Sequence, residues 1–260
     1  GEGVMDRLHG IGGSDTGDLF QIEPYGCARR LWYEKRGVEP DYPEPENAHM
    51  KRGKKLEDLA AEEFAEATGT TVRRSTIEWE HPYAPMMAHV DRLAADKTVV
   101  EIKIPARWNW IRIKRNGLPE SWLLQGQHYC ETLDYNRVVY AVQSVDPWEQ
   151  FQLTVERDHE LGKAIVAKAQ DFWKQVKEGP APVAFDPGDR RCAGCAYRNT
   201  CHGADYASLL VHFQDREGDP IAPEAAPELS GELGVYREAK ALADEATAVA
   251  EETREALTKA

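Results

Sequence analysis

The run TVVEIKIP, at residues 98–105, limits the possible folds more than any other segment. In it, three aliphatic residues alternate with two charged ones: Val100, Ile102, Ile104, Glu101 and Lys103. Since successive side chains of a strand point to opposite faces of a sheet, the alternation predicts a strand with one aliphatic face and one charged face. A short AADK turn joins this run to a second strand-like run, PMMAHVDRL. We therefore expect an antiparallel hairpin that closes near Asp96 and brings Asp91 close to Glu101.

Strand-like and helix-like patterns succeed one another along the rest of the chain up to the cysteine-rich segment. We expect further strands at 70–80, 137–143 and 149–156, and helices at 47–68, 119–133 and 158–177. These patterns predict an α/β domain with a central mixed sheet flanked by helices. An Ala/Glu-rich pattern from about residue 228 predicts a C-terminal helical appendage.

The helix expected at 47–68 carries a candidate acid at the edge of its apolar stripe. The stripe comprises Leu56, Leu59, Ala60, Phe64 and Ala67. On a helical wheel Glu57 falls beside Phe64, where a carboxylate can point inward and stay near water. Glu63 falls inside the same stripe, so the pattern alone does not single out Glu57.

Composition and charge assign the protein to a broad class. With 260 residues, 42% hydrophobic and 30% charged, the chain fits one globular domain with or without an appendage, and it needs no disulfide framework to fold. No apolar run approaches the roughly 20 residues that cross a bilayer, so we expect a soluble cytoplasmic protein with no membrane partner. The formal charge of -13 argues against a nucleic-acid partner, but 13 acidic and 5 basic residues lie at 202–260, so the acid is concentrated in the tail.

The segment 102–119 is basic and aromatic. It contains no acidic residue, and its basic and aromatic members are Lys103, Arg107, Arg112, Lys114, Arg115, Trp108 and Trp110. Such a stretch next to an acidic site suits a groove for a nucleic-acid backbone, with the tryptophans as candidates for stacking. A solvated helix face accounts for the same pattern, and the sequence leaves both open.

Asp91, Glu101 and Lys103 form a candidate catalytic set on the expected hairpin. Two carboxylates and the backbone carbonyl of Ile102 offer hard oxygen ligands, which Mg²⁺ or Mn²⁺ prefers, and Glu57 would complete the set from the helix. A divalent ion there would lower the pKa of a bound water and neutralise charge on a phosphate oxygen. An ordinary solvated strand face is the alternative.

Further polar residues lie on the helix expected at 119–133, where Gln125 and Tyr129, four residues apart, can hold a phosphate or a base edge. Five motifs now follow one another along the chain: RLHGIGGSD, RGKKLEDLAAEEF, MMAHVDRL, VVEIKIP and WLLQGQHY. In this order they resemble the PD-(D/E)XK nucleases, specifically the lambda exonuclease and YqaJ-type viral recombinase branch. The resemblance runs from about residue 7 to residue 140 and implies a restriction-endonuclease-like core.

The resemblance implies roles for individual residues. The groups that bind the catalytic metal would be the side chains of Glu57, Asp91 and Glu101 and the carbonyl of Ile102. Lys103 would assist the attacking water, and Gln125 would support the active site. Arg7 and Ser14 would hold the 5'-phosphate of the digested strand. From the residue patterns described above, Tyr129, Arg107 and Trp108 are also expected to contact DNA.

The function implied by the resemblance is that of a Mg²⁺-dependent exonuclease. It would digest duplex DNA ends from 5' to 3' and leave 3' overhangs for recombination, in the cytoplasm of a bacterial or phage-infected cell. A single-strand annealing protein and further copies of the chain are candidate partners. Two other functions stay open: a single-strand exonuclease or nicking endonuclease of the iron-sulfur nuclease kind, and a non-catalytic module that binds DNA ends.

The cysteines indicate a second metal site. Cys192, Cys195 and Cys201 supply three soft ligands within ten residues, and the fourth ligand is either His202, for a compact zinc site, or Cys27, for four thiolates around a 4Fe-4S cluster or zinc. The early GCARRLWY and the late cysteines resemble the iron-sulfur nucleases of CRISPR adaptation and of the AddB type. This resemblance implies a 4Fe-4S cluster on Cys27 and the three late cysteines, with zinc as the alternative.

The position of the cysteines and the acidic composition of the tail suggest how the chain is divided. We expect a nuclease domain at 1–203, held together by the four-cysteine metal cluster, and an acidic linker with a C-terminal helix at 204–260. Cys130 lies inside the helix expected at 119–133 and is predicted to be a buried core residue.

Overall fold

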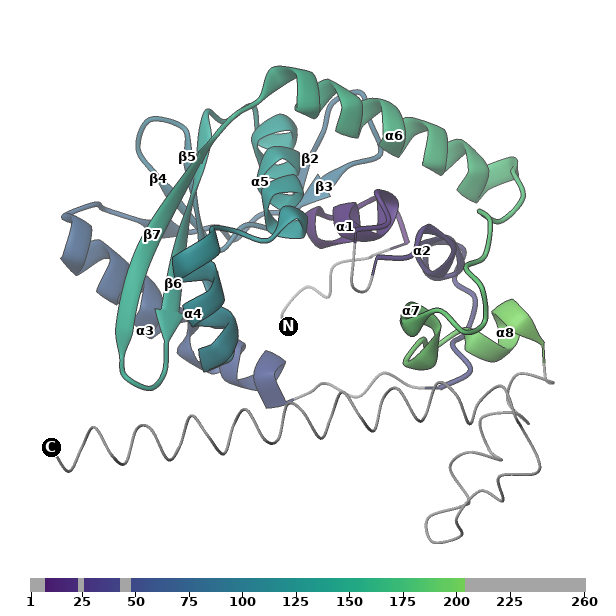
Figure 1. The fold of residues 1–260 in the computed structure, drawn as a ribbon. Helices are drawn as coiled ribbons and strands as arrows, with labels where there is room; N and C mark the ends of the chain where they lie inside the picture. The colour runs from purple at the N-terminus through teal and green to yellow at the C-terminus, as the bar shows by residue number, and fades with distance from the viewer. Residues whose placement is uncertain (1–7, 23–25, 43–47, 204–260) are drawn as a thin grey trace, which may run out of the picture. The chain divides into compact units, whose positions relative to one another are not determined.

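In the computed structural model, residues 8–22, 26–42 and 48–203 are described, and they form an α/β domain around one mixed sheet (Figure 1). The five-stranded sheet has the order β1-β4-β5-β6-β7. Its strands are β1 (Arg73–Arg74), β4 (Arg92–Ala94), β5 (Thr98–Lys103), β6 (Arg137–Ser144) and β7 (Glu149–Glu156). β5 and β6 are parallel, and the other neighbouring pairs are antiparallel. The expected mixed sheet is thus confirmed.

The expected hairpin is formed by β4 and β5, with Arg92 opposite Val100. Asp96 and Lys97 make its turn with positive φ angles of 57° and 52°. A separate two-stranded sheet consists of β2 (Trp79–Glu80) and β3 (Met87–Ala88). The runs at 70–80 and 85–93, each expected to be one strand, are therefore divided between the two sheets.

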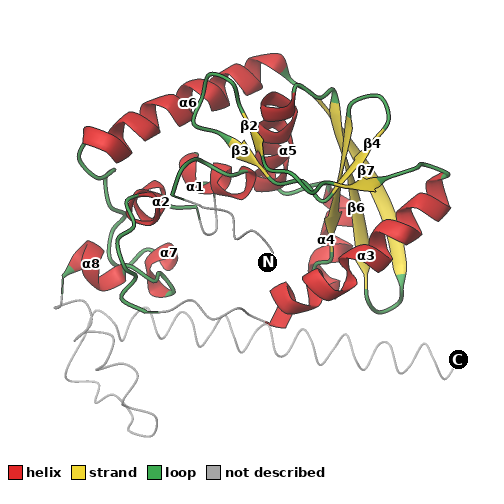
Figure 2. Cartoon of the chain, turned by 180° about the vertical axis from the view of Figure 1, so that it is seen from behind, coloured by secondary structure: helices red, strands yellow, loops and turns green. Residues whose placement is uncertain are grey.

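Helices cover both faces of the main sheet. The longer ones are α2 (Ala28–Lys35), α3 (Ala48–Thr68), α4 (Arg107–Asn116), α5 (Glu120–Leu133) and α6 (His159–Glu178). Short helical segments are η1 (Gly13–Asp15), α1 (Thr16–Leu19), α7 (Arg190–Ala193) and α8 (Arg198–His202). Figures 1 and 2 show α2, α7 and α8 gathered at the end of the domain away from the main sheet.

The alternation along β5 divides the core as the sequence predicts. Val100 and Ile102 pack against Phe64 of α3 on one face. Val99 and the β6 residue Tyr140 pack against α4 and α5 on the other. The stripe expected on α3 needs a correction, because Leu59 and Ala67 are exposed and Ala61 is buried, so the contact face is centred on residues 60, 61 and 64.

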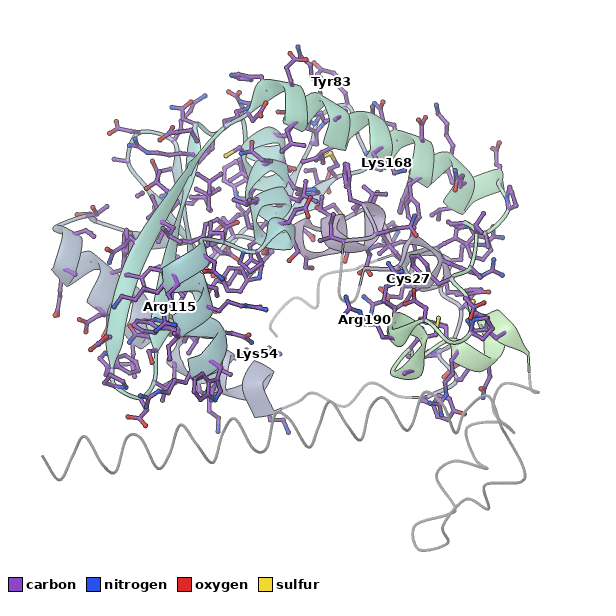
Figure 3. All side chains as sticks on the ribbon, in the orientation of Figure 1. Cys27, Lys54, Tyr83, Arg115, Lys168 and Arg190 are labelled. Carbon is purple, nitrogen blue, oxygen red and sulfur yellow. The ribbon has the colours of Figure 1, made fainter. Side chains whose placement is uncertain are left out.

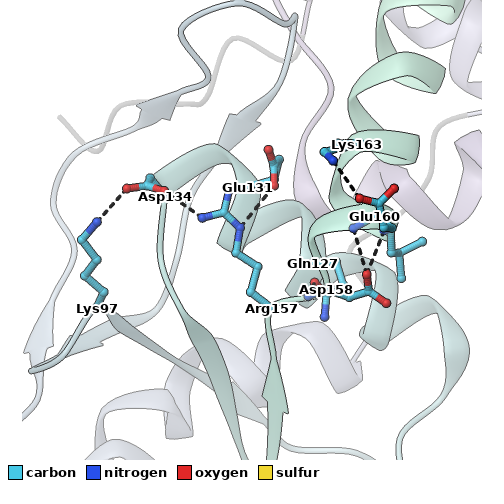
Figure 4. Close-up of polar contacts among 9 residues, drawn as sticks. Lys97, Gln127, Glu131, Asp134, Arg157, Asp158, Glu160 and Lys163 are labelled. Atoms are coloured by element: carbon cyan, nitrogen blue, oxygen red, sulfur yellow. Dashed lines mark hydrogen bonds and ion pairs between the residues drawn. The ribbon is translucent and has the colours of Figure 1, made fainter.

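Charged residues join the end of α5 to the start of α6 (Figure 4). Arg157 donates to Glu131 and to Asp134, both at 2.8 Å. Asp158 caps α6 by accepting from two backbone amides, each at 3.0 Å. The capping carboxylate explains why the helix begins at His159.

The acidic C-terminal helix expected from residue 228 lies outside the described residues, as does Arg7. None of the described helices combines the length and apolar character that crossing a bilayer requires.

Candidate active site

Lys103, Glu101 and Gln125 form one hydrogen-bonded group where β5 meets α5. Lys103 Nζ donates to Glu101 Oε1 at 2.9 Å and to Gln125 Oε1 at 3.0 Å. Gln125 Nε2 donates to Glu101 Oε1 at 3.2 Å and to the hydroxyl of Tyr129 at 2.8 Å. The ammonium is therefore fixed by two acceptors, beside a carboxylate that is only 4% exposed.

Asp91 enters the same site from the end of the loop before β4. Its Oδ2 accepts from the backbone N–H of Ile102 at 2.8 Å, so the carboxylate is held against β5 next to Glu101. Burial, with the nearby carboxylates of Glu101 and Glu57, raises the pKa of Asp91 well above its usual value. Because neighbouring carboxylates disfavour the charged form of Asp91, a bound cation would stabilise it.

The structure separates the two acids that the helical wheel left open. Glu57 Oε1 accepts from Arg92 Nη1 at 2.7 Å, beside Asp91. Glu63 instead accepts from Trp148 Nε1 at 3.3 Å. Of the two, Glu57 is the one that the fold brings to the other acids.

The donor chemistry of the site suits a hard divalent cation. Glu101 Oε2 is buried and has no hydrogen-bond partner, so it is an acceptor that a bound cation would satisfy. Within the described part of the chain, no three His, Cys, Asp or Glu side chains stand close enough together to hold a metal ion as they are. The side chains of Glu57, Asp91 and Glu101 would have to move closer together to form a metal shell, and the role of the Ile102 carbonyl stays a prediction.

Two residues next to the site were missed by the sequence analysis. Arg92 is 5% exposed and also donates to the carbonyl of Asp91 at 2.8 Å and to Asp58. Lys103 Nζ lies over the ring of Trp122, 5.1 Å from the ring centroid, and makes a cation-π contact with it. Two sequence signals could have indicated these residues. One is an arginine directly after Asp91 in an otherwise apolar strand, and the other is a tryptophan one helical turn before Gln125.

The residues expected to contact DNA occupy different environments. Ser14 is exposed in η1, beside Gly13, where an added Cβ would lie 2.4 Å from Tyr129 Cε1. Arg107 and Trp108 are exposed at the start of α4, Trp108 by 82%. Ser14, Arg107 and Trp108 are thus open to a ligand.

Two aromatic residues are not open in this way. Tyr129 is buried, and its hydroxyl accepts from Gln125, so it supports that side chain and does not face a DNA strand. Trp110 is also buried and donates to the carbonyl of Val142 at 3.0 Å, so the stacking role considered for it is wrong. Both face inward because they belong to the core cluster between α4, α5 and the sheet.

The four candidate cysteines line one pocket although 165 positions separate Cys27 from Cys192, but no three of these described residues stand close enough together to hold a metal ion as they are. One pocket is lined by Cys27, Cys192, Cys195, Cys201, His202, Arg30, Arg191 and Arg198 among others. Burial, with the neighbouring thiols, raises the pKa of Cys192 to about 11. Figure 3 shows Cys27 at the start of α2, beside α7. Cys130 lies apart from these, fully buried as predicted.

Comparison with solved structures identifies the class of fold. The alkaline exonuclease LHK-Exo from Laribacter hongkongensis is 23% identical, with a TM-score of 0.57, over 66% of this chain and 89% of that one. The structure of LHK-Exo in complex with dAMP matches equally well. The domain therefore has the fold of the alkaline exonucleases.

Sequence comparison identifies the family. Residues 4–136, just over half of the chain, match the YqaJ-like viral recombinase domain. The uncharacterized protein YqaJ of Bacillus subtilis (strain 168) is 32% identical over 190 residues, which cover 70% of this chain and 58% of that protein. The chain belongs to the YqaJ-like viral recombinase domain family, and it spans less than two thirds of this curated relative.

Proposed function

We propose that the protein is a divalent-metal-dependent DNA exonuclease. The observation that carries the proposal is the group of Lys103, Glu101 and Gln125 beside Asp91 and Glu57, in a chain of this family and fold. A bound Mg²⁺ or Mn²⁺ would lower the pKa of the attacking water and neutralise charge on the phosphate.

The residues of the chain would divide the remaining work. Asp91, Glu101 and Glu57 would hold the cation, and Arg92 fixes one oxygen of Glu57. Lys103, held at Nζ by two acceptors, would orient the water as it attacks phosphorus. The P–O3' bond breaks as the water oxygen bonds to phosphorus and O3' takes up a proton, so the released nucleotide ends in a 3'-hydroxyl and the shortened strand keeps a new 5'-phosphate.

Basic residues on α3 and α4 support a DNA substrate. Lys51, Arg52, Lys54 and Lys55 precede Glu57 on α3, and Arg112 and Arg115 are exposed on α4; Figure 3 labels Lys54 and Arg115. With Arg107 and Trp108 they would contact the phosphate backbone and stack on bases. Ser14, with Arg7, would hold a 5'-phosphate, which favours digestion from 5' to 3' and 3' overhangs as products.

The test is digestion of linear duplex DNA labelled at either end, with and without Mg²⁺. We expect release of mononucleotides from 5' ends only with the metal, and a loss of at least about 100-fold in Lys103→Ala. Lys97→Ala, which removes an exposed lysine paired with Asp134, is the matched control and should keep full activity. Release from 3' ends or nicking would support the alternative nuclease functions, and binding without cleavage in either protein would indicate a DNA-end-binding module.

We also propose a 4Fe-4S cluster in the four-cysteine pocket, with zinc as the alternative metal. Four soft donors line the pocket, and Arg30, Arg191 and Arg198 would offset the negative charge of metal-bound thiolates. Iron, sulfide and zinc analysis of anaerobically purified protein decides between the two. A protein with neither metal contradicts this part of the proposal and leaves the nuclease part intact.

Partners follow from the proposed products. A 3' overhang is a substrate for a single-strand annealing protein, and several copies of the chain could act together on one DNA end. The cytoplasm of a bacterial or phage-infected cell is where such DNA ends occur. Pull-down with an annealing protein and light scattering of the full chain test these two interactions.

A further inference from the structure

A buried carboxylate connects the four-cysteine pocket to the segment beside the catalytic helix. Asp18, in α1, accepts from the backbone N–H of Cys27 at 2.8 Å through Oδ1. Both of its oxygens also accept from Arg30 Nη2, at 2.8 and 2.7 Å. Arg30 and Cys27 both line the pocket, so the Asp18 side chain holds two of the residues that line it.

The backbone around Cys27 is held equally closely. Cys27 is the N-cap of α2, and its Sγ accepts from the N–H of Arg30 at 3.4 Å. A Cβ on Gly26 would lie 2.4 Å from the carbonyl oxygen of Gly17 and 2.5 Å from that of Ile22. A residue with a side chain does not fit at position 26, so Cys27 follows a tight contact with α1.

We propose that Asp18 is a positioning residue that holds Cys27 in the four-cysteine pocket. Without its carboxylate, the N–H of Cys27 and the guanidinium of Arg30 lose a shared acceptor, and the thiol is released from α1. This proposal depends on the metal site proposed above in one respect only, namely the identity of the ligand that the pocket binds. The placement of the Cys27 thiol can be tested in protein without metal.

The segment that carries Asp18 continues toward the catalytic group. Gly13, one short helical segment earlier, lies against the ring of Tyr129, whose hydroxyl accepts from Gln125. The segment that contains Asp18 thus contacts Cys27 through Asp18 and Tyr129 through Gly13. Tyr129 in turn is hydrogen-bonded to Gln125, which accepts from Lys103.

The experiment measures how fast each cysteine is alkylated. Chelator-treated wild-type protein, Asp18→Ala and Asp15→Ala are exposed to iodoacetamide, and each cysteine peptide is followed by mass spectrometry. Asp15→Ala is the matched control, because it removes the other buried ion pair between the same segments, Asp15 with Lys35 at 2.6 Å. We expect alkylation of Cys27 to become about ten-fold faster in Asp18→Ala and to change less than two-fold in Asp15→Ala.

Two results would overturn the proposal: an unchanged rate for Cys27 in Asp18→Ala, or an equal rise in both variants. If Asp18→Ala does not fold by circular dichroism, Asp18→Asn decides, since its amide oxygen can still accept from Cys27 while its NH2 group faces Arg30. A rise of a few-fold is then expected, and no rise contradicts the proposal.

Metal content separates this proposal from the one on which it rests. Wild-type protein that binds no iron or zinc contradicts the metal site, while the alkylation rates still judge Asp18. If wild-type protein binds metal, we expect Asp18→Ala to retain less than half of it per chain. Full retention together with unchanged alkylation would show that Cys27 needs no help from Asp18.

Discussion

At the scale of single residues, the acids of α3 show what the sequence could not decide. A wheel places Glu57 and Glu63 on or beside the same stripe, because it contains no information about the partner surface. The structure supplies that surface: Arg92 and Asp91 face Glu57, and Trp148 faces Glu63. The pairing of β4 with β5 brings Arg92 under α3, and this pairing is a long-range property of the fold.

Glu57→Gln should weaken Mn²⁺ binding, because it removes a negative charge from the proposed metal shell. We expect the dissociation constant to rise about ten-fold or more, which corresponds to about 1.4 kcal/mol, as measured by isothermal titration calorimetry. Glu63→Gln is the control and should leave Mn²⁺ affinity within two-fold. Equal effects in the two variants would argue against Glu57 as a ligand.

We expect His128 to make the stability of the protein depend on pH. Burial lowers its pKa to about 4, and its ring bonds to Thr16 and to the carbonyl of Met87. Between pH 4 and the ordinary pKa of about 6.5, the unfolded chain binds a proton that the folded chain excludes. The free energy of unfolding should therefore fall as the pH drops through this window, by up to about 3 kcal/mol.

Urea unfolding at several pH values measures this effect. His128→Asn cannot bind the proton in either state, so the difference in stability between wild type and variant should shrink as the pH falls from 6.5 toward 4. A constant difference across this range would show that His128 does not contribute.

At the scale of elements, the sequence predicts those parts that have a clear period. β5, β6, β7, α5 and α6 lie where alternation or helical periodicity places them. β2 and β3 have two residues each, too few to show alternation, so their separate sheet could not be foreseen. Alternation along β5 placed Glu101 and Lys103 on one face, and the family resemblance suggested the roles of Glu57 and Gln125. Arg92 and the Asp18 contact depend instead on packing between distant segments.

The contact between α5 and β6 requires a glycine. A Cβ on Gly126 would lie 2.8 Å from the hydroxyl of Tyr140, which donates to the carbonyl of Trp122. Gly126→Ala should therefore lower the free energy of unfolding by about 1 to 3 kcal/mol in urea titrations. Gly53→Ala, on α3, is the control: its Cβ meets nothing within 4 Å, and better helix propensity should stabilise the protein by up to about 1 kcal/mol. If Gly126→Ala leaves the free energy of unfolding unchanged or raises it, the contact between α5 and β6 does not require a glycine.

At the scale of the whole molecule, a metal bound in the four-cysteine pocket would close a long loop. A metal that joined Cys27 to Cys192 would restrict the unfolded chain much as a disulfide does, and for a loop of this length such a link would contribute roughly 5 kcal/mol. The closed loop contains every proposed catalytic residue from Glu57 to Gln125.

Cys27→Ser should consequently destabilise the metal-loaded protein by about 2 to 4 kcal/mol in urea titrations. The same substitution should cost less than about 1 kcal/mol after chelation, because no link then exists to be lost. Cys130→Ala removes a thiol outside the pocket, so its effect should be the same with and without metal. If Cys27→Ser lowers the free energy of unfolding by the same amount with and without metal, the proposed metal link between Cys27 and the late cysteines is contradicted.

The position of the pocket in the chain also sets an order for synthesis. A ribosome makes Cys27 before the proposed catalytic residues, and Cys192, Cys195 and Cys201 after them. A nascent chain released before Cys192 would possess the catalytic residues but not the completed pocket. Occupancy of the pocket would therefore distinguish finished nuclease domains from truncated ones.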